Sequence, residues 1–558
     1  MFRRSAIKWL PILLLILVPL AIYAYSLGNG FVVWDDDILV YENPLVKHLS
    51  LYSIWAVFTS YDPELYIPLT FLSYQMEHVL FGMNASVFHT TNLLLHITST
   101  ILVYILLQRW NLTRWVAFAA ALIFAIHPMN SEGVCWVSAR KDLLSNALFL
   151  ATLLAWERYR TTEDRKRYVS AVALFALALL AKVSVVLLPA ILLLMDWREQ
   201  RTINRTTFRE VVPFAFLSAI FIVIALFGKT SNIASLTPMK TLLLSAKSIF
   251  FYPITYLFPF SLSSIYHQNT PITFARMEFI IPILLIALIT LLSLYALRRS
   301  RAPLFSLLFF LMMLAPSFAN FSKMGGLYFA SDRYIGIAQI GLLYILAVGW
   351  SLLQKTHWHV PVTIITTIFG LIILPAFAFA SFQRSVLWGD SETLFRDAME
   401  KNPGSAVIHF NLAVVEQERG KYHEALALYE KAIAIRHDYS PPLNNAGVIY
   451  RDLGNRAKAE EFIRKAVDLD PHNLAAVINL ASVLLDRGDA DEAIVLLERA
   501  LAEDPYNVPA LSKLGAAYGK KEMYKEGLRA FQKAWKLDPV MHEQSKELEK
   551  MLEELEKQ

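Results

Sequence analysis

Long apolar runs recur through the first two-thirds of the chain, and they predict membrane helices. A helix needs about 20 apolar residues to cross a bilayer core. Several runs are shorter, which predicts tilted or broken helices. We therefore expect residues 1–381 to form an all-α, polytopic membrane domain. The predicted spans are 7–26, 87–108, 115–128, 143–156, 168–181, 183–195, 211–228, 277–297, 303–320, 335–353 and 360–381.

The distribution of positive charge predicts how these spans are oriented. Of the 28 Lys and Arg in residues 1–381, 18 fall in the N-terminal segment and five connections. Connections rich in Lys and Arg are usually cytoplasmic. This layout leaves a further apolar stretch, 241–258, re-entering the membrane or lying at its outer interface. The five connections are 109–114, 156–168, 197–209, 298–301 and 354–359.

A competing layout merges 168–195 into one long helix and makes 241–258 a true span. It puts the loop from Arg198 to Arg209 outside, which the charge rule disfavours. Both layouts give about eleven crossings and place residues 382–558 outside the cytoplasm. A cleaved signal peptide is an alternative reading of the first run, although no small-residue cleavage site follows Leu20 cleanly.

The C-terminal part repeats with a period of 34 residues, which is the tetratricopeptide pattern. Small residues at fixed offsets allow two antiparallel helices to approach closely, and larger ones fill the space between repeats. Proline closes each second helix because it cannot donate the next hydrogen bond. The small series are Ala413, Gly447, Ala481 and Gly515; Ala425, Ala459, Ala493 and Gly527; and Ala432, Ala466, Ala500 and Ala534. The large series is Tyr429, Ile463, Leu497 and Phe531, and the prolines are Pro471, Pro505 and Pro539.

We expect four segments from these patterns. They are a membrane domain over 1–381, a linker with a half repeat over 382–402, repeats over 403–540, and a charged capping helix over 541–558. Terminal caps with a polar face keep such solenoids soluble. The groove of a solenoid of this kind usually holds a protein or peptide partner.

Composition narrows the function classes. Of the 558 residues, 56% are hydrophobic and 18% are charged, which excludes an ordinary soluble enzyme and a disordered chain. The lone cysteine, Cys135, excludes an intramolecular disulfide and a cysteine metal cluster. The net charge of +5 combines +11 over 1–381 with −6 over 382–558. The basic part is the membrane part, so nucleic acid is not an expected partner.

Three adjacent carboxylates open the first outside segment. Asp35, Asp36 and Asp37 follow the first span closely, where charge is costly without water, a cation or a function. A carboxylate there suits a general base for a hydroxyl nucleophile. The group is also a candidate Mg²⁺ or Mn²⁺ site. The alternative is a solvated loop start that caps a helix.

The second outside loop is short and dense in ionisable groups. Arg140 and Lys141 are candidates for binding a lipid phosphate. Glu132 is a candidate catalytic residue that, like His127, could assist or orient, and Asp142 is a further candidate. In the alternative reading, the two cations extend to lipid headgroups and His127 caps a helix.

Three more residues complete the candidate set. Lys182 lies between two apolar halves, where a lysine either pairs with a carboxylate or binds phosphate. Arg333 opens a later span from the outside and has Asp332 as its expected local partner. His267 is a candidate for touching a sugar, although an exposed histidine is the more common case. The sequence contains no nucleotide-binding loop, zinc-protease motif or serine-hydrolase elbow.

Three stretches carry a resemblance to a known family. The first runs from Phe31 to Asp36, the second from Tyr66 to His96, and the third from His127 to Asp142. Together with the repeats, they resemble the glycosyltransferase C superfamily of membrane enzymes. The closer resemblance is to the transmembrane and tetratricopeptide repeat-containing O-mannosyltransferases and their bacterial relatives.

This resemblance implies a polyprenyl or dolichyl monophosphate sugar, such as a mannose donor, and transfer to a protein hydroxyl outside the cytoplasm. Asp35 and Asp36 fall on the family's paired acids, and we expect Asp36 to be the base with Asp35 orienting. The candidate phosphate ligands are Arg140, Lys141, Lys182 and Arg333. The chain departs from the family at Ile67, where arginine is usual, and at Val183, where glutamate is usual.

Other functions stay open at this point. A non-catalytic tetratricopeptide scaffold or assembly factor would use the spans only as an anchor. A lipid-linked glycan ligase or transporter is a third reading. The expected location is a bacterial inner membrane with a periplasmic active site, or an endoplasmic reticulum membrane with a lumenal one. The sequence leaves open the sugar, the acceptor, the lipid length, the metal requirement and the oligomeric state.

Overall fold

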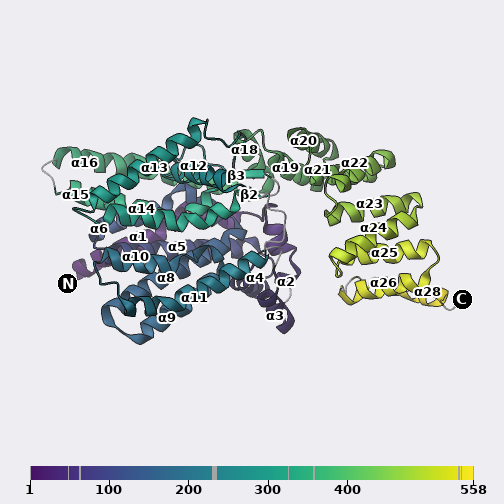
Figure 1. Cartoon of the computed structure of the whole chain (residues 1–558), viewed down its shortest axis with the longest axis horizontal. Coiled ribbons are helices and arrows are strands. Elements are labelled where there is room, and N and C mark those ends of the chain that lie inside the picture. Colours follow the sequence, from purple (N-terminus) through teal and green to yellow (C-terminus); the bar gives the residue numbers. More distant parts are fainter. Residues whose placement is uncertain are drawn as a thin grey trace. The chain divides into compact units, whose positions relative to one another are not determined.

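The computed structural model describes residues 2–47, 49–61, 65–228, 236–323, 326–355, 359–537, 541, 543 and 545–556. The chain divides into two compact units, Met1–Asn402 and Pro403–Gln558. The first unit is a helical bundle and the second is a series of helix pairs (Figure 1). The predicted all-α fold class is confirmed.

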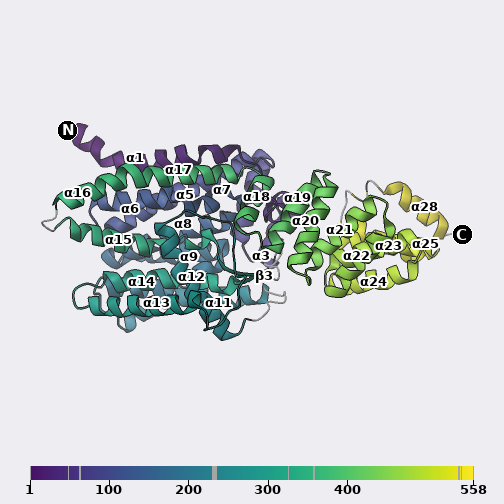
Figure 2. The ribbon, with the colours of Figure 1, turned by 90° about the horizontal axis from the view of Figure 1, so that it is seen from above.

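Long helices of the first unit run along a common direction (Figures 1 and 2). Six segments of the described residues are long and apolar enough to cross a membrane: Trp9–Gly28, Ala85–Arg109, Arg205–Gly228, Met277–Ala296, Ala302–Asn320 and Ile364–Leu387. The bundle helices are α1 Phe2–Tyr23, α5 Ala85–Arg109, α6 Arg114–Ile126, α8 Arg140–Thr162, α9 Arg165–Ala181, α10 Leu188–Arg198, α11 Arg205–Gly228, α13 Met277–Ala296, α14 Ala302–Leu314, α15 Gln339–Leu353, α16 His359–Ile368 and α17 Leu374–Leu387.

Four of the five predicted basic connections meet at one end of this bundle, here called the basic end, and residues 356–358 of the fifth lie outside the described residues. Arg198 donates to the carbonyl of Trp110 at 3.4 Å, and Arg301 donates to the carbonyl of Trp197. Arg160 forms an ion pair with Glu210 at 2.7 Å. The loop over 197–209 therefore lies with 109–114, 156–168 and 298–301. This grouping contradicts the competing layout, which put 197–209 at the opposite end.

A break separates α9 from α10, so the single helix over 168–195 of the competing layout is also wrong. Lys182 adopts an extended conformation, and a short 3₁₀ turn, Val183–Val185, follows it. Two hydroxyl groups donate hydrogen bonds to backbone carbonyls beside this break. Thr70 donates to the carbonyl of Ala181 at 3.1 Å, and Ser145 donates to that of Ala178 at 3.1 Å. The bond from Thr70 gives a partner to a carbonyl next to the break, whereas the carbonyl of Ala178 also accepts the backbone N–H of Lys182 at 3.0 Å.

The segment 241–258 forms α12, Pro238–Leu257, and both of its halves contact the end of the bundle opposite the basic end. Leu243 and Leu244 pack with Phe279 in the first turn of α13. The carbonyl of Tyr256 accepts a hydrogen bond from His127 at 2.8 Å. Because it both begins and ends there, α12 agrees with the layout that kept this segment at the outer side.

Short elements gather at the same end of the bundle, here called the site end. Residues 322–323 and 326–330 pair as an antiparallel hairpin, and the sheet order is β1-β3-β2. These elements are α2 Pro44–Lys47, α3 Leu51–Thr59, α4 Pro68–Phe81, α7 Ser131–Cys135, α18 Ser391–Lys401, β1 Tyr266–His267, β2 Ser322–Lys323 and β3 Gly326–Ala330.

The second unit contains the predicted tetratricopeptide helix pairs. A methyl group on Gly447 would overlap the side chain of Ile463, and one on Gly515 would meet Phe531 at 2.6 Å. The small and large series therefore complement each other as predicted. The helices are α19 Ala406–Glu418, α20 Tyr422–Ile435, α21 Ser440–Asp452, α22 Arg456–Leu469, α23 Leu474–Arg487, α24 Ala490–Glu503, α25 Val508–Lys520 and α26 Tyr524–Leu537.

Both ends of the predicted repeat region have defined positions. The helix α28, Lys546–Glu556, packs Leu552 against Leu528 and Trp535 of α26, as a terminal cap would. Pro471 and Pro505 follow the ends of α22 and α24 as predicted, and Pro539 lies outside the described residues. The proposed half repeat, α18, falls in the first unit, where Phe395 contacts Trp34.

Candidate active site

Asp36 points into the protein and holds two loops together. Its carboxylate is fully buried and accepts hydrogen bonds from the backbone N–H of Val32 at 3.0 Å and from Ser138. Ser138 donates through both its backbone N–H, at 2.9 Å, and its hydroxyl, at 2.6 Å. Burial raises the pKa of Asp36 to about 6. These contacts join the segment that follows α1 to the loop that precedes α8.

Asp35 is the more accessible acid of the pair. Its side chain is 31% exposed, and one carboxylate oxygen lies 3.9 Å from Nζ of Lys141. Asp37 begins a separate helical turn over Asp37–Tyr41. The three carboxylates therefore do not converge, and within the described part of the chain no group of three His, Cys, Asp or Glu side chains could hold a metal ion.

Arg140 uses all five of its N–H donors inside the protein. Its Nε donates to Asn92, and its two terminal nitrogens form a double contact with Glu77 at 2.9 and 3.1 Å. The remaining bonds go to the hydroxyl of Ser73 and the carbonyl of Phe88. A guanidinium has five donors in a fixed plane, so no donor remains for a lipid phosphate. The geometry indicates a structural ion pair.

Lys141, the next residue, is buried but has no hydrogen-bond partner among the described residues. Its Nζ lies 4.9 Å from the ring centre of Trp136, and a cation near an aromatic face is stabilised. Burial lowers the pKa of this amine to about 8, and the negative charge of Asp35 opposes that shift. The amine is therefore a cation with unused donors beside an acid.

Arg333 approaches the same tryptophan from another element, a 3₁₀ turn at Asp332–Ile335. Its guanidinium carbon also lies 4.9 Å from the ring centre of Trp136. The nearest carboxylate is not the expected Asp332 but Glu132, at 2.6 Å. The Nε of Arg333 has no hydrogen-bond partner in the described structure. Asp332 instead accepts a hydrogen bond from Tyr266 at 2.8 Å.

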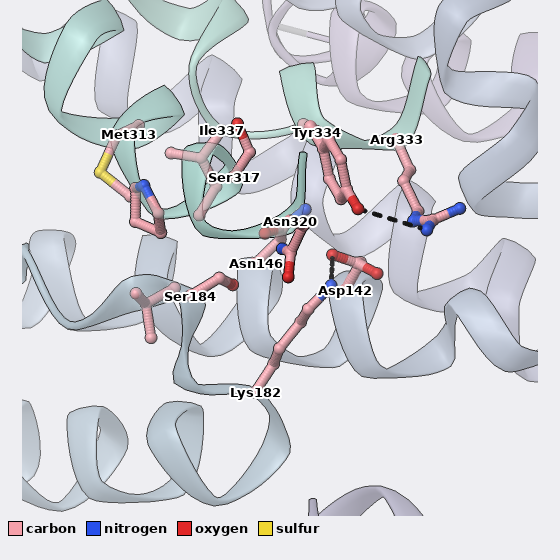
Figure 3. A pocket seen from close by; sticks show the side chains of 13 residues that line it. Asp142, Asn146, Lys182, Ser184, Met313, Ser317, Asn320, Arg333, Tyr334 and Ile337 are labelled. Carbon is pink, nitrogen blue, oxygen red and sulfur yellow. Dashed lines mark hydrogen bonds and ion pairs between the residues drawn. The ribbon is translucent and has the colours of Figure 1, made fainter. Parts of the chain in front are cut away.

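Asp142 and Lys182 form the other side of the site. Their ion pair measures 2.5 Å, so Lys182 takes the carboxylate-paired alternative of the two that its sequence position allowed. Burial favours a raised pKa for Asp142, but the charges of Lys182 and Arg333 outweigh it and leave the pKa below its usual value. Figure 3 shows Arg333 and Tyr334 on one wall of a small pocket and Asp142 and Lys182 on the other.

The two candidate histidines have structural contacts. His127 donates from Nε2 to the carbonyl of Tyr256, and its Nδ1 accepts the backbone N–H of Met129 at 3.3 Å. His267 lies on β1 and packs against the ring of Tyr328 with 4.4 Å between centres. Neither of the described pockets that Arg333 lines includes His267.

Four residues of this site escaped prediction. Glu77 and Asn92 complete the shell of Arg140, Ser138 holds Asp36, and the ring centre of Trp136 lies 4.9 Å from each of the two cations Lys141 and Arg333. One signal was available: Glu77 is the sole acidic residue of the apolar segment 68–81, and a carboxylate in such a segment needs a cation.

Family models match both parts of the chain. Residues 68–228 match the model described as dolichyl-phosphate-mannose-protein mannosyltransferase. Tetratricopeptide repeat models match 404–472, 450–518 and 484–542. The first match contains Glu132, the cations of α8 and Lys182, whereas Asp35 and Arg333 lie outside it.

Curated relatives share this combination over most of the chain. The human protein O-mannosyl-transferase TMTC1 is 24% identical over 77% of this chain and 55% of its own length. The mouse protein O-mannosyl-transferase TMTC3 is 22% identical over 84% of this chain and 56% of its own length. The resemblance predicted from the sequence is confirmed. This chain joins a helical unit that matches the mannosyltransferase model to a tetratricopeptide solenoid.

The extent of these similarities is limited. The chain spans about half the length of the curated relatives named above. Among solved structures, it is similar to a crystal structure of MamA protein, at 18% identity over 30% of this chain and 87% of that one, with a TM-score of 0.24.

Proposed function

We propose that this protein is a membrane glycosyltransferase. It transfers a sugar, mannose in the simplest case, from a polyprenyl or dolichyl monophosphate to a protein hydroxyl outside the cytoplasm. The observation that carries this proposal is the position of Asp35, an accessible acid beside two buried cations that have unused donors. The names of the relatives, which are O-mannosyl-transferases, agree with this chemistry.

The donor phosphate is proposed to bind between Lys141 and Arg333. Both cations lie 4.9 Å from the ring centre of Trp136, so they are no more than about 10 Å apart. Glu132 holds Arg333 in place, and the pair of Asp142 and Lys182 borders the same pocket. Charge-assisted hydrogen bonds to phosphate are stronger than neutral ones. Arg140 is proposed to stabilise the fold rather than to bind the phosphate, because its five N–H donors already have partners within the protein.

Asp35 is proposed as the general base, which reverses the expected roles of the two acids. Asp36 accepts three hydrogen bonds and is fully buried, so an acceptor hydroxyl would have to displace them to reach it. Asp35 is partly exposed, so an acceptor hydroxyl could approach its carboxylate without displacing such hydrogen bonds. In this assignment Asp36 positions the loop that carries Asp35.

The proposed transfer is a single displacement. The acceptor oxygen attacks the anomeric carbon as its proton passes to the carboxylate of Asp35. The bond from that carbon to the phosphate oxygen breaks, and its electron pair leaves with the polyprenyl phosphate. Attack opposite the leaving group inverts the configuration, as in inverting glycosidases. Lys141 and Arg333 stabilise the charge that develops on the phosphate.

The tetratricopeptide unit is proposed to hold the protein acceptor. A tethered binding unit raises the effective concentration of its ligand near the active site. The proposed location is a bacterial inner membrane or an endoplasmic reticulum membrane, with the site end and the repeats facing the periplasm or the lumen.

A transfer assay with the full-length protein in nanodiscs tests this function. The donor is polyprenyl-phosphate mannose and the acceptor is a serine- and threonine-rich polypeptide. Asp35→Asn should slow transfer by about 10²–10⁴-fold, the usual contribution of a general base. Asp37→Asn is the matched control and should keep most of the activity. Full activity in Asp35→Asn would refute the assignment, and absence of transfer by the wild type with every polyprenyl-phosphate sugar would refute the function.

A further inference from the structure

The helix α18, predicted as a half repeat, contacts the segment that leads into the acids. Ser391, at the start of α18, accepts a hydrogen bond from the backbone N–H of Val33 at 2.9 Å and is only 8% exposed. One turn later, the ring centre of Phe395 lies 5.4 Å from that of Trp34. Because Asp35 is the next residue, α18 holds the backbone that leads directly into the accessible acid.

A second set of contacts connects α18 to the turn Asp332–Ile335, which carries Arg333. Arg384, in the last turn of α17, lies between the two elements. Its guanidinium donates to the carboxylate of Asp397 on α18 at 3.4 Å, and it lies 3.9 Å from the carboxylate of Asp332. Burial raises the pKa of Asp332 to about 8, and the charge of Arg384 is the strongest influence that opposes this shift. The turn is therefore held by an ion pair at the residue before Arg333.

A chain of hydrogen bonds runs from the end of α18 to the same aspartate. The side chain of Asn402 donates to the hydroxyl of Ser263 at 3.0 Å. The backbone N–H of Ser263 donates to the hydroxyl of Tyr266 at 3.0 Å, and that hydroxyl donates to Asp332 at 2.8 Å. Because Asp332 is fully buried, water is not available to replace either route of contact.

We propose that α18 holds the acid-bearing segment and the turn of Arg333 at a fixed separation, with Ser391 and Arg384 as positioning residues. Neither residue is placed against the substrate, since they act through the neighbouring Asp35 and Arg333. Catalytic groups must be held within about 0.5 Å of the productive geometry, and groups on separate loops need an element that contacts both. The positioning follows from the contacts alone, whereas its effect on transfer rests on the proposed function.

Hydrogen exchange read by mass spectrometry tests the positioning without any assay of transfer. Full-length Arg384→Gln in nanodiscs should exchange the backbone N–H groups over 326–336 about tenfold faster than wild type, because a charge-assisted contact is lost. Ser391→Ala should speed exchange over 30–38 by about 2–10-fold, the usual contribution of one hydrogen bond.

A matched control is Arg396→Gln, because Arg396 also lies on α18 but is 49% exposed and pairs with Glu392 of the same helix. It should leave both segments unchanged, and all three variants should leave 109–114 and 197–209 at the basic end unchanged. Unchanged exchange over both segments in Arg384→Gln and Ser391→Ala would overturn the proposal. An equal increase at the basic end would also overturn it, because that result identifies a general loss of stability.

The transfer assay then measures the effect on the reaction. Arg384→Gln should lower kcat by up to about 100-fold, as a small misplacement of a catalytic group can, and Arg384→Lys should recover part of the loss. Added to Arg333→Gln, it should cause no further loss, because it acts through Arg333. The same loss in both backgrounds would overturn the positioning role. Absence of transfer by the wild type would refute the proposed function, and the exchange data would still decide this inference.

Discussion

At the scale of single residues, the neighbours Arg140 and Lys141 have opposite environments at the start of α8. Arg140 has every donor paired, whereas Lys141 has none of its donors paired in the described structure. Successive positions on a helix point about 100° apart. The sequence identified both as cations near the site, but their direction depends on which helices pack against α8. That information lies in the tertiary structure.

The structural role assigned to Arg140 gives the first prediction. Arg140→Gln should lower the free energy of unfolding by about 3–5 kcal/mol, because it leaves Glu77 buried without its partner. Removing both charges in Arg140→Gln with Glu77→Gln should recover part of this loss. Thermal unfolding in detergent measures both effects. An unchanged unfolding temperature together with weakened donor binding would instead identify Arg140 as a phosphate ligand.

The free amine of Lys141 gives a prediction about pH. Because its pKa is lowered to about 8, the side chain loses its positive charge as the pH rises through that value. The KM for the donor should therefore rise above about pH 8 in the wild type. Lys141→Arg should remove this dependence, because a guanidinium stays charged. The exposed Lys240→Arg is the control, and a wild-type profile in Lys141→Arg would contradict the role.

At the scale of elements, charge patterns predicted the arrangement better than apolar length did. The basic connections placed 197–209 correctly at the basic end, and they required α12 to begin and end at the site end. Length alone was ambiguous, because 168–195 is long enough for one helix. No proline or glycine adjoins Lys182, so the local sequence gives no signal for the break. It depends on Asp142, Thr70 and Ser145, which come from distant parts of the chain.

The repeat helices give a prediction about packing. Gly447→Ala should destabilise the repeats by about 1–3 kcal/mol, the usual cost of overpacking, because the new methyl meets Ile463. Adding Ile463→Val should recover part of this cost. Gly519→Ala on α25 is the matched control, since nothing lies within 4 Å of a Cβ there. Urea unfolding of residues 403–558 followed by circular dichroism measures all three. Equal destabilisation by both alanines would contradict the packing argument.

At the scale of the whole molecule, two compact units correspond to the change from an apolar basic composition to a polar acidic one. The period of 34 residues predicted the helix pairs of the second unit and their packing positions, since each repeat has small and large residues at the same offsets. The site of the first unit was only partly readable. Its acids and cations could be named, but their contacts could not, because Asp36 meets Ser138 across 102 residues of the chain and Arg140 meets Glu77 across 63.

The proposed role of the repeats is tested by removing them. A chain ending at Asn402 should lose more activity toward a folded protein acceptor than toward a short peptide, because only the former would use the groove. Both acceptors are assayed at matched amounts of membrane-inserted enzyme. Equal losses would mean that the repeats contribute to stability alone.

The hydroxyl bonds at the α9–α10 break also restrict how the bundle can move. Alternating-access carriers rock one half of the molecule against the other. Here Thr70 on α4 donates to the carbonyl of Ala181 at the interruption, so sliding α4 would take a hydrogen-bond partner from that peptide group. This arrangement suits a fixed reaction site, as the proposed transfer from a lipid-linked donor needs, rather than a carrier that moves its cargo across.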